Sequence, residues 1–105
     1  MARRVAWTEV AWRDLERVAD YLAEDSPAYA AALVRRVRDA ARSLTEMPKR
    51  GRVVPEMDHE AVRELILSSY RLIYEVRGDD VYVLALVHGA RDLASLLRLE
   101  ERRPD

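Results

Sequence analysis

Residues 70–87 read YRLIYEVRGDDVYVLALV and predict a β-hairpin. Up to residue 76, apolar residues at even positions alternate with mostly charged residues at odd ones, which is the period of a strand with one buried face. The turn that follows contains Gly78, which tolerates the positive φ that tight hairpin turns need. Residues 81–87 are apolar without interruption, as in a strand that is covered on both faces. We therefore expect 81–87 to be the central strand of a sheet.

Two amphipathic helices are predicted to precede this hairpin. Thr8 and Ser26 are expected N-caps, because a hydroxyl accepts a hydrogen bond from a free N–H of the first helical turn. Apolar residues then follow at helical spacing within 11–22 and again within 33–47. Pro48 should end the second helix, since a proline disfavours helical geometry in the residue before it. The link between the helices is short, so they should fold back as an antiparallel hairpin.

The remaining segments complete a β-α-α-β-β-β order. We expect strands at 4–7 and 62–68, a loop at 49–60 and a short C-terminal helix at 93–101. Helices grouped together and followed by a strand meander predict an α+β fold, with the helical hairpin packed on a mainly antiparallel sheet. The length suits one domain over residues 1–105, with 94–105 as a C-terminal segment.

The composition excludes several classes of protein. Without cysteine the chain has no thiol chemistry and no disulfide framework, which fits a reducing cytoplasm. The formal net charge of −1 does not favour general binding to nucleic acid. No apolar run approaches the length of a membrane span. We expect a cytoplasmic protein without membrane contact, cofactor or metal.

Basic residues are concentrated in one segment. Residues 35–52 contain seven bases against only Asp39 and Glu46. One interpretation is a solvated helix face that is neutralised by other parts of the molecule. The other is a surface for an anionic or acidic partner, with Arg35, Arg36, Arg38 and Arg42 as its helical part.

Arginines near the strand ends are candidates for a binding site. Arg71 lies on the strand face opposite the tyrosines, and Arg91 follows the predicted exit from the 81–87 strand, where loops often carry function. With Arg63 they could form a cationic patch that binds phosphate or carboxylate. Alternatively, Arg63 and Arg71 pair with Glu64 and Glu75 across neighbouring strands. His88 at the strand end fits either a structural hydrogen bond or a catalytic role.

Four blocks of sequence together resemble the ParE/RelE toxin family. They are Pro48–Glu56 (PKRGRVVPE), Val62–Leu65 (VREL), Tyr70–Val76 (YRLIYEV) and His88–Leu93 (HGARDL). The blocks stand in the family's order and spacing, and with the helices the resemblance covers about residues 3–97. It implies the toxin half of a bacterial type II toxin–antitoxin system, one that arrests growth or stabilises a plasmid. It also implies a hetero-oligomer with a cognate antitoxin, ParD-like or other.

The family contains two activities, and the resemblance points to different residues for each. In RelE-like members, which cleave mRNA on the ribosome, basic strand residues and a C-terminal tyrosine do the chemistry. Here Arg63, Arg71 and Arg91 could fill basic positions. However, the second basic position is Leu65, the tyrosine position matches Leu97, and no tyrosine follows Tyr82. A leucine cannot transfer a proton.

The blocks are more similar to ParE-like members, which inhibit DNA gyrase by binding and are not enzymes. On that basis the target-binding residues would be Arg71, His88, Arg91 and Asp92. The antitoxin would contact Arg35, Arg36, Arg38 and Arg42. A binding module of the same fold without toxicity remains a third alternative.

Overall fold

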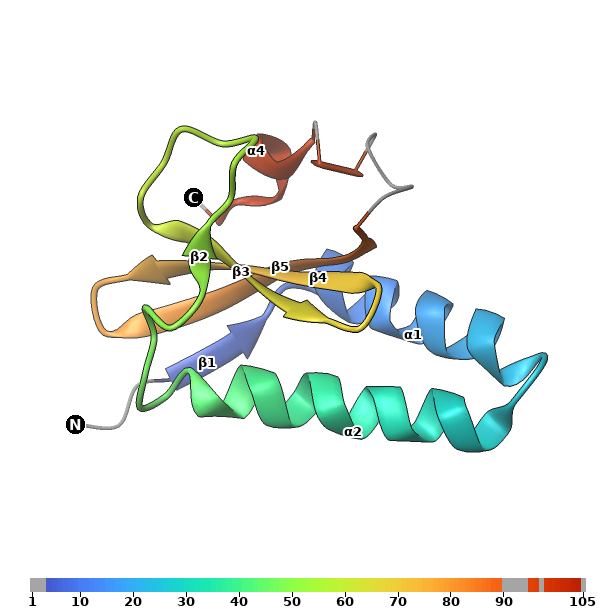
Figure 1. The fold of residues 1–105 in the computed structure, drawn as a ribbon. Helices are drawn as coiled ribbons and strands as arrows, with labels where there is room; N and C mark the ends of the chain where they lie inside the picture. The colour runs from blue at the N-terminus through green and yellow to red at the C-terminus, as the bar shows by residue number, and fades with distance from the viewer. Residues whose placement is uncertain (1–3, 90–94, 97, 105) are drawn as a thin grey trace.

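The computed structural model describes residues 4–89, 95–96 and 98–104 of the chain. In chain order the elements are β1 (Arg4–Trp7), α1 (Glu9–Ala23), α2 (Pro27–Ser43), β2 (Arg52–Val53), β3 (Val62–Leu67), β4 (Tyr70–Arg77), β5 (Asp80–His88) and α4 (Leu99–Arg102). Helices α1 and α2 run antiparallel along one face of the sheet, and α4 lies on the other face (Figure 1). The predicted α+β class and the short C-terminal helix are confirmed.

The five strands are ordered β1-β5-β4-β3-β2. β1 pairs with β5 in parallel, and the other three pairings are antiparallel. β5 is therefore an interior strand, but the middle position belongs to β4, so the expected central strand is wrong by one place. The reason is that β5 is the last strand of the β3-β4-β5 meander and becomes interior only because β1 pairs with its outer edge.

Both predicted N-caps are confirmed. The Thr8 hydroxyl accepts a hydrogen bond from the N–H of Ala11 at 3.2 Å and donates one to the carbonyl of Val83 at 2.9 Å. The start of α1 is thereby fixed to β5. Ser26 accepts in the same way from the N–H of Tyr29 at 3.1 Å. Capping by a hydroxyl satisfies backbone donors that the first helical turn leaves free.

The second helix ends earlier than its proline predicts. α2 stops at Ser43, and the buried Leu44 caps it. The next residues form turns that lead toward β2, and Met47 is 58% exposed rather than part of the buried stripe. Turn geometry therefore ends the helix before the steric effect of Pro48 applies.

The expected loop at 49–60 contains a strand that the sequence did not indicate. Arg52 and Val53 pair with Glu64 and Arg63 of β3. Gly51 precedes this strand in close contact with the sheet, because a Cβ there would lie 2.5 Å from the carbonyl oxygen of Glu64. Two residues are too few to show a period, so only the pairing defines this strand.

The sheet has an apolar core on each face. The core under α1 and α2 contains Ala11, Leu15, Leu33, Val37, Ala41, Leu44, Leu65, Leu67, Tyr70, Leu72, Tyr74, Val81, Val83 and Leu86. The opposite core contains Val54, Val62, Ile73, Leu84, Ala85, Val87, Leu96 and Leu99. β5 thus contributes to both cores, as its uninterrupted apolar run predicts.

A β-bulge explains how β5 divides its residues between the two cores. The register shifts so that Ile73 faces Ala85 while Tyr74 faces Val83, which leaves Leu84 as the extra residue. Leu84 and Ala85 consequently belong to the same core, and the alternation of β5 resumes with the opposite parity.

The predicted C-terminal helix at 93–101 is described only in part. Residues 95 and 96 are helical and α4 follows at Leu99–Arg102, whereas residues 93, 94 and 97 of the predicted helix lie outside the described ones. Leu96 and Leu99 enter the second core. No helix within the described residues is long and apolar enough to cross a bilayer.

Candidate functional site

Arg71 lies at the centre of an ion-pair network on the sheet face that carries α4. Its guanidinium donates from Nε to Glu64 at 2.5 Å, and from Nη1 and Nη2 to the two oxygens of Glu56 at 3.1 and 2.7 Å. The arginine is 6% exposed and Glu64 is 1% exposed. The alternative that Arg71 pairs with Glu64 across the sheet is therefore the one that the structure adopts.

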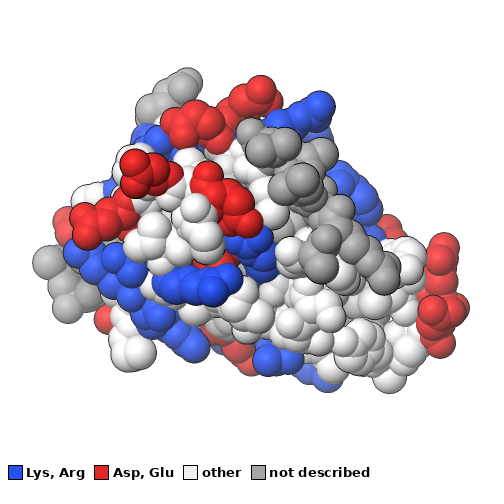
Figure 2. Space-filling model, turned by 45° about the horizontal axis from the view of Figure 1, so that its top comes forward, with Lys and Arg blue, Asp and Glu red and all other residues white. Residues whose placement is uncertain are grey.

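Arg52 of β2 extends this network. Its Nε donates to the second oxygen of Glu64 at 2.5 Å, so that one buried carboxylate joins two guanidinium groups. The network of Arg52, Glu56, Glu64 and Arg71 has no net charge. Hydrogen bonding to Glu56 raises the pKa of Arg71, and the same bond lowers the pKa of Glu56. Figure 2, which brings the α4 side forward, shows acidic and basic side chains interspersed near the middle of this face.

The chain leaves β5 directly beside Arg71. The N–H of Gly89 donates to the carbonyl of Ser69 at 2.8 Å, and a Cβ on Gly89 would lie 3.4 Å from Cγ and Cδ of Arg71. Arg91 and Asp92, which the resemblance places in the target site, lie outside the described residues.

The candidate arginines of the sheet do not share a face. Arg63 pairs in register with Tyr74 and shares the helix-covered face with Leu65, whereas Arg71 pairs with Ile66 on the opposite face. The expected patch that contains both Arg63 and Arg71 is therefore wrong. Arg71 shares a face with its partner Ile66, and Ile66 is three residues from Arg63 along β3, an odd number that places the two side chains on opposite faces. Arg63 instead donates to the carbonyl of Gly51 at 2.9 Å.

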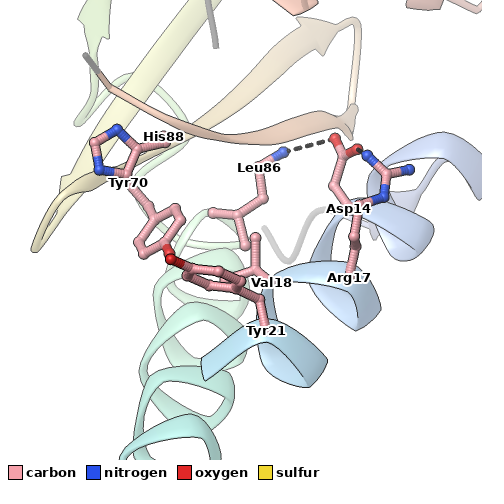
Figure 3. A pocket seen from close by; sticks show the side chains of 7 residues that line it. All are labelled: Asp14, Arg17, Val18, Tyr21, Tyr70, Leu86 and His88. Carbon is pink, nitrogen blue, oxygen red and sulfur yellow. Dashed lines mark hydrogen bonds and ion pairs between the residues drawn. The ribbon is translucent and has the colours of Figure 1, made fainter. Parts of the chain in front are cut away.

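His88 is also on the face opposite Arg71. Its ring packs edge-on against Tyr70, with 5.5 Å between the centroids. Figure 3 shows both side chains at one end of an open pocket of about 300 Å³. The lining residues are Asp14, Arg17, Val18, Tyr21, Tyr70, Leu86 and His88. The four expected target-binding residues therefore include two, Arg71 and His88, that the sheet separates.

Asp14 at the other end of this pocket connects three elements. Its buried carboxylate accepts from the N–H of Leu86 at 3.0 Å and from Nη1 of Arg102 at 2.6 Å. Arg102 also donates to the carbonyl of Leu84 at 3.3 Å. Asp14 of α1 therefore binds β5 directly at Leu86 and binds the C-terminal segment through Arg102, which also contacts the bulge at Leu84.

A third buried carboxylate holds the C-terminal segment. Glu75 receives hydrogen bonds from Nε and Nη2 of Arg103 at 2.7 and 3.0 Å, and from Arg77 at 2.8 Å. Burial alone would raise the pKa of Glu75, but the bonds from Arg103 and Arg77 outweigh it and lower the pKa. Nη2 of Arg103 also lies 3.0 Å from Nε2 of His59.

Sequence reasoning missed the partners contributed by distant segments. Glu56 faces Arg71 across 15 positions, and Asp14 faces Arg102 across 88. The sequence offered one indication, since Glu64 and Glu75 are acids in strands whose uncharged residues are mostly apolar. Buried acids require cationic partners, but the sequence alone does not identify which arginines or lysines pair with them.

The arginines of α2 lie on two different flanks of that helix. All four are exposed. At about 100° per residue, Arg35, Arg38 and Arg42 share one flank, and Arg36 lies on the other. Arg38 and Arg42 line a groove of about 250 Å³ together with Val5, Trp7, Ala41 and Thr45. This groove lies between α2 and the edge strand β1.

Comparison with known proteins places the chain in a family. A family model described as "ParE toxin of type II toxin-antitoxin system, parDE" matches residues 5–93. The chain belongs to this toxin family. It is accordingly a type II toxin of the ParE/RelE superfamily.

Some of the similar proteins are named RelE, and another belongs to a ParDE system. Toxin RelE2 of Caulobacter vibrioides is 34% identical over 88 residues, which cover 84% of this chain and 97% of that one. The chromosomal ParDE toxin–antitoxin system of Pseudomonas aeruginosa gives a TM-score of 0.68 at 22% identity, covering 83% of this chain and 96% of that chain. A mutant of E. coli toxin RelE in the free state also gives 0.68, at 16% identity, covering 96% and 98%. These structures show the shared ParE/RelE fold.

Proposed function

We propose that this ParE-family chain inhibits DNA gyrase by binding it in the bacterial cytoplasm and does not cleave RNA itself. The main support for the proposal is that the Arg71 guanidinium is already paired with two carboxylates. Both of its acidic partners, Glu56 and Glu64, are bonded to it, and the surrounding network is neutral. A phosphate could reach this guanidinium only after Glu56 had moved, whereas a ribonuclease needs cations that are already directed at the phosphate.

The residue types at two further positions support the same proposal. Leu65 is buried in the core under the helices. No tyrosine follows Tyr82 in the sequence. Loss of a general acid typically lowers a rate by about 10² to 10⁴. A chain that lacks both groups would be a feeble nuclease, while inhibition by binding does not require either.

The test measures both activities on the same purified protein. We expect inhibition of gyrase supercoiling or trapping of cleaved DNA, with mRNA on translating ribosomes left intact. Arg91→Ala should weaken the effect on gyrase. Arg98→Ala is the matched control, because Arg98 is an exposed arginine of the same C-terminal region. Equal loss in both variants would count against a specific role for Arg91.

The RelE-like alternative rests on the similarity to Toxin RelE2. Codon-specific mRNA cleavage with gyrase untouched would establish it and overturn the proposal. The catalytic candidates would then be Arg71 and Arg91, with Arg63 excluded from the same centre by its place on the opposite face. Normal growth after induction of the chain would instead indicate a binding module without toxicity.

A cognate antitoxin is the second part of the proposal. The family description and the P. aeruginosa ParDE structure both refer to toxin–antitoxin systems. We expect an amphipathic antitoxin segment whose apolar residues enter the groove at Val5, Trp7 and Ala41. Its acidic residues would face Arg38 and Arg42 on the rim, where charge contributes mainly to the rate and selectivity of association.

The two flanks of α2 allow a matched test of this surface. Arg35→Glu with Arg38→Glu should slow association with the antitoxin and flatten its dependence on salt. Arg36→Glu reverses one charge instead of two, on the opposite flank. Although Arg36 is one of the expected antitoxin contacts, it does not line the groove, so this variant should leave the association rate nearly unchanged. If Arg36→Glu slows association as much as the other variant, the effect is one of overall charge and the interface lies elsewhere.

A further inference from the structure

A second polar pocket opens at the end of the sheet, away from the Arg71 network. Its volume is about 310 Å³. It is lined by Lys49, Glu60, Ala61, Arg63, Val76 and Gly78. Lys49 belongs to the segment before β2, and Gly78 to the turn between β4 and β5. None of these residues belongs to the surfaces assigned above to gyrase or to the antitoxin.

Among the described arginines that are not exposed, Arg63 alone has no acidic partner within the part of the chain that the structure describes. Its Nη1 donates to the carbonyl of Gly51 at 2.9 Å and reaches that of Lys49 at 3.5 Å. Its Nε is buried and has no hydrogen-bond partner among the described residues. The other described arginines that are not exposed, Arg71, Arg77, Arg102 and Arg103, each pair with a carboxylate. A buried donor without a partner is a cost to the fold that native structures rarely retain.

The edge of Arg63 that remains unpaired is one that recognises carboxylates. Arg103 shows this geometry within the same molecule, where Nε and Nη2 donate in parallel to the two oxygens of Glu75. In Arg63 the contact to Gly51 uses Nη1 and Nε has no partner among the described residues, so the side-on edge of Nε and Nη2 is the one left for a ligand. Because Nε is covered, the guanidinium must turn toward the pocket to pair side-on. That movement would give the buried N–H the partner that it lacks.

The net charge of the pocket favours a ligand with a single negative charge. Lys49 and Arg63 contribute two positive charges and Glu60 one negative charge, which leaves one positive charge. A single carboxylate neutralises it, whereas a phosphate dianion would exceed it and would face Glu60. We infer that Arg63 and Lys49 form a binding site for a single carboxylate group. The site is independent of whether gyrase is the target.

The test uses acetate as the probe and the arginine Nε–H resonances of the intact protein as the readout. Sodium acetate should shift the Nε–H of Arg63 and the amides of Gly51 and Gly78 with saturation. Sodium chloride at equal ionic strength should not. Shifts that are linear and identical in acetate and chloride would overturn the inference. Tighter binding of inorganic phosphate than of acetate would also overturn it, in favour of a phosphate site.

Two variants distinguish side-on pairing by the Arg63 guanidinium from a general effect of positive charge. Arg63→Lys keeps the charge and should weaken acetate binding about tenfold, because a side-on pair is lost. Arg50→Lys is the control, since Arg50 is exposed and donates to Ser43 instead of lining the pocket. If Arg63→Lys does not fold, Lys49→Gln at the exposed rim provides the test and should also weaken binding. Unchanged affinity in a folded Lys49 or Arg63 variant would contradict the site.

Discussion

The two faces of the sheet are buried by different physical means. Under α1 and α2 the contacts are apolar side chains that alternate along the strands and recur along the helices. On the opposite face a smaller apolar core is surrounded by buried ion pairs, in which Glu64 and Glu75 hold Arg71 and Arg103. The helix side therefore depends on shape and apolar area. The other side depends on each charge keeping its partner.

The two kinds of contact should respond differently to pH and salt. Apolar packing does not depend on pH, whereas paired charges respond to pH and are weakened by salt screening. Gly89, where the described chain leaves β5, lies beside Arg71 on the ion-paired face. Four substitutions measure how far the two faces differ.

The largest effect is expected in the helix-side core. Leu33→Ala removes a buried side chain between α2 and the sheet and should lower the free energy of unfolding by about 2–5 kcal/mol. The loss should be the same at pH 7 and pH 5, because no charge is involved. Urea denaturation at the two pH values measures it. A loss that varies with pH would show that the two faces are coupled.

On the opposite face, Glu64→Gln should have the next largest effect. The change keeps the shape but removes the charge between Arg52 and Arg71, which should cost about 1.5–3 kcal/mol. Chemical denaturation gives the value, and Glu60→Gln at a loop position is the control. A cost below that of the control would mean that Glu56 alone satisfies Arg71.

The pH dependence of stability should originate mainly from the ion-paired face. The folded pKa of Glu75 is lowered below its ordinary value of 4.5, so the unfolded chain takes up the proton first. Its stabilisation is present above about pH 4.5 and is lost as the pH falls through the lowered pKa. Glu75→Gln should flatten this acid limb in denaturation curves between pH 7 and pH 3, while Leu33→Ala should leave its slope unchanged. Equal slopes in Glu75→Gln and the parent protein would contradict the assignment.

The smallest effect is expected on the outer surface of the helices. Arg13 pairs with Glu9 one turn earlier on α1, and both side chains are exposed. Arg13→Ala should change the free energy of unfolding by no more than about 0.5 kcal/mol, because water screens such pairs. Thermal unfolding measures it. A change comparable to that of Glu64→Gln would remove the distinction between buried and surface ion pairs.

The sequence predicts the helix side of the molecule better than the other side. Caps at Thr8 and Ser26 are local features, and both are confirmed. The strand at 70–76 is also confirmed, but its alternation predicted one buried face, whereas Arg71, Ile73 and Glu75 on the other face are buried too. β2 was missed, because Arg52 and Val53 become a strand only through pairing with β3. The bulge at Leu84 was also missed, since an apolar run conceals a change of parity.

The candidate site was less predictable than the fold. The pairing of Arg71 with Glu64 was one of two alternatives, and cross-strand proximity could not exclude the other. Glu56 and Arg102 find their partners only after loops and the C-terminal segment have folded onto the sheet. Long-range ion pairs have no period, so no local pattern indicates them. The placement of Arg63 and Arg71 on opposite faces follows from register, which the hairpin link at Ser68 determines through its positive φ.

The parallel pairing of β1 with β5 has a consequence for synthesis on the ribosome. Arg4 pairs with Asp80, so the first strand of the chain has no sheet to join until the last strand has been made. Helices α1 and α2 are translated before the meander of β3, β4 and β5 that they cover. Contacts of such large sequence separation form late and slowly. A ribosome must therefore translate well past residue 80 before this toxin can acquire its folded surface, which leaves a period during translation when the chain has no native form in which to act.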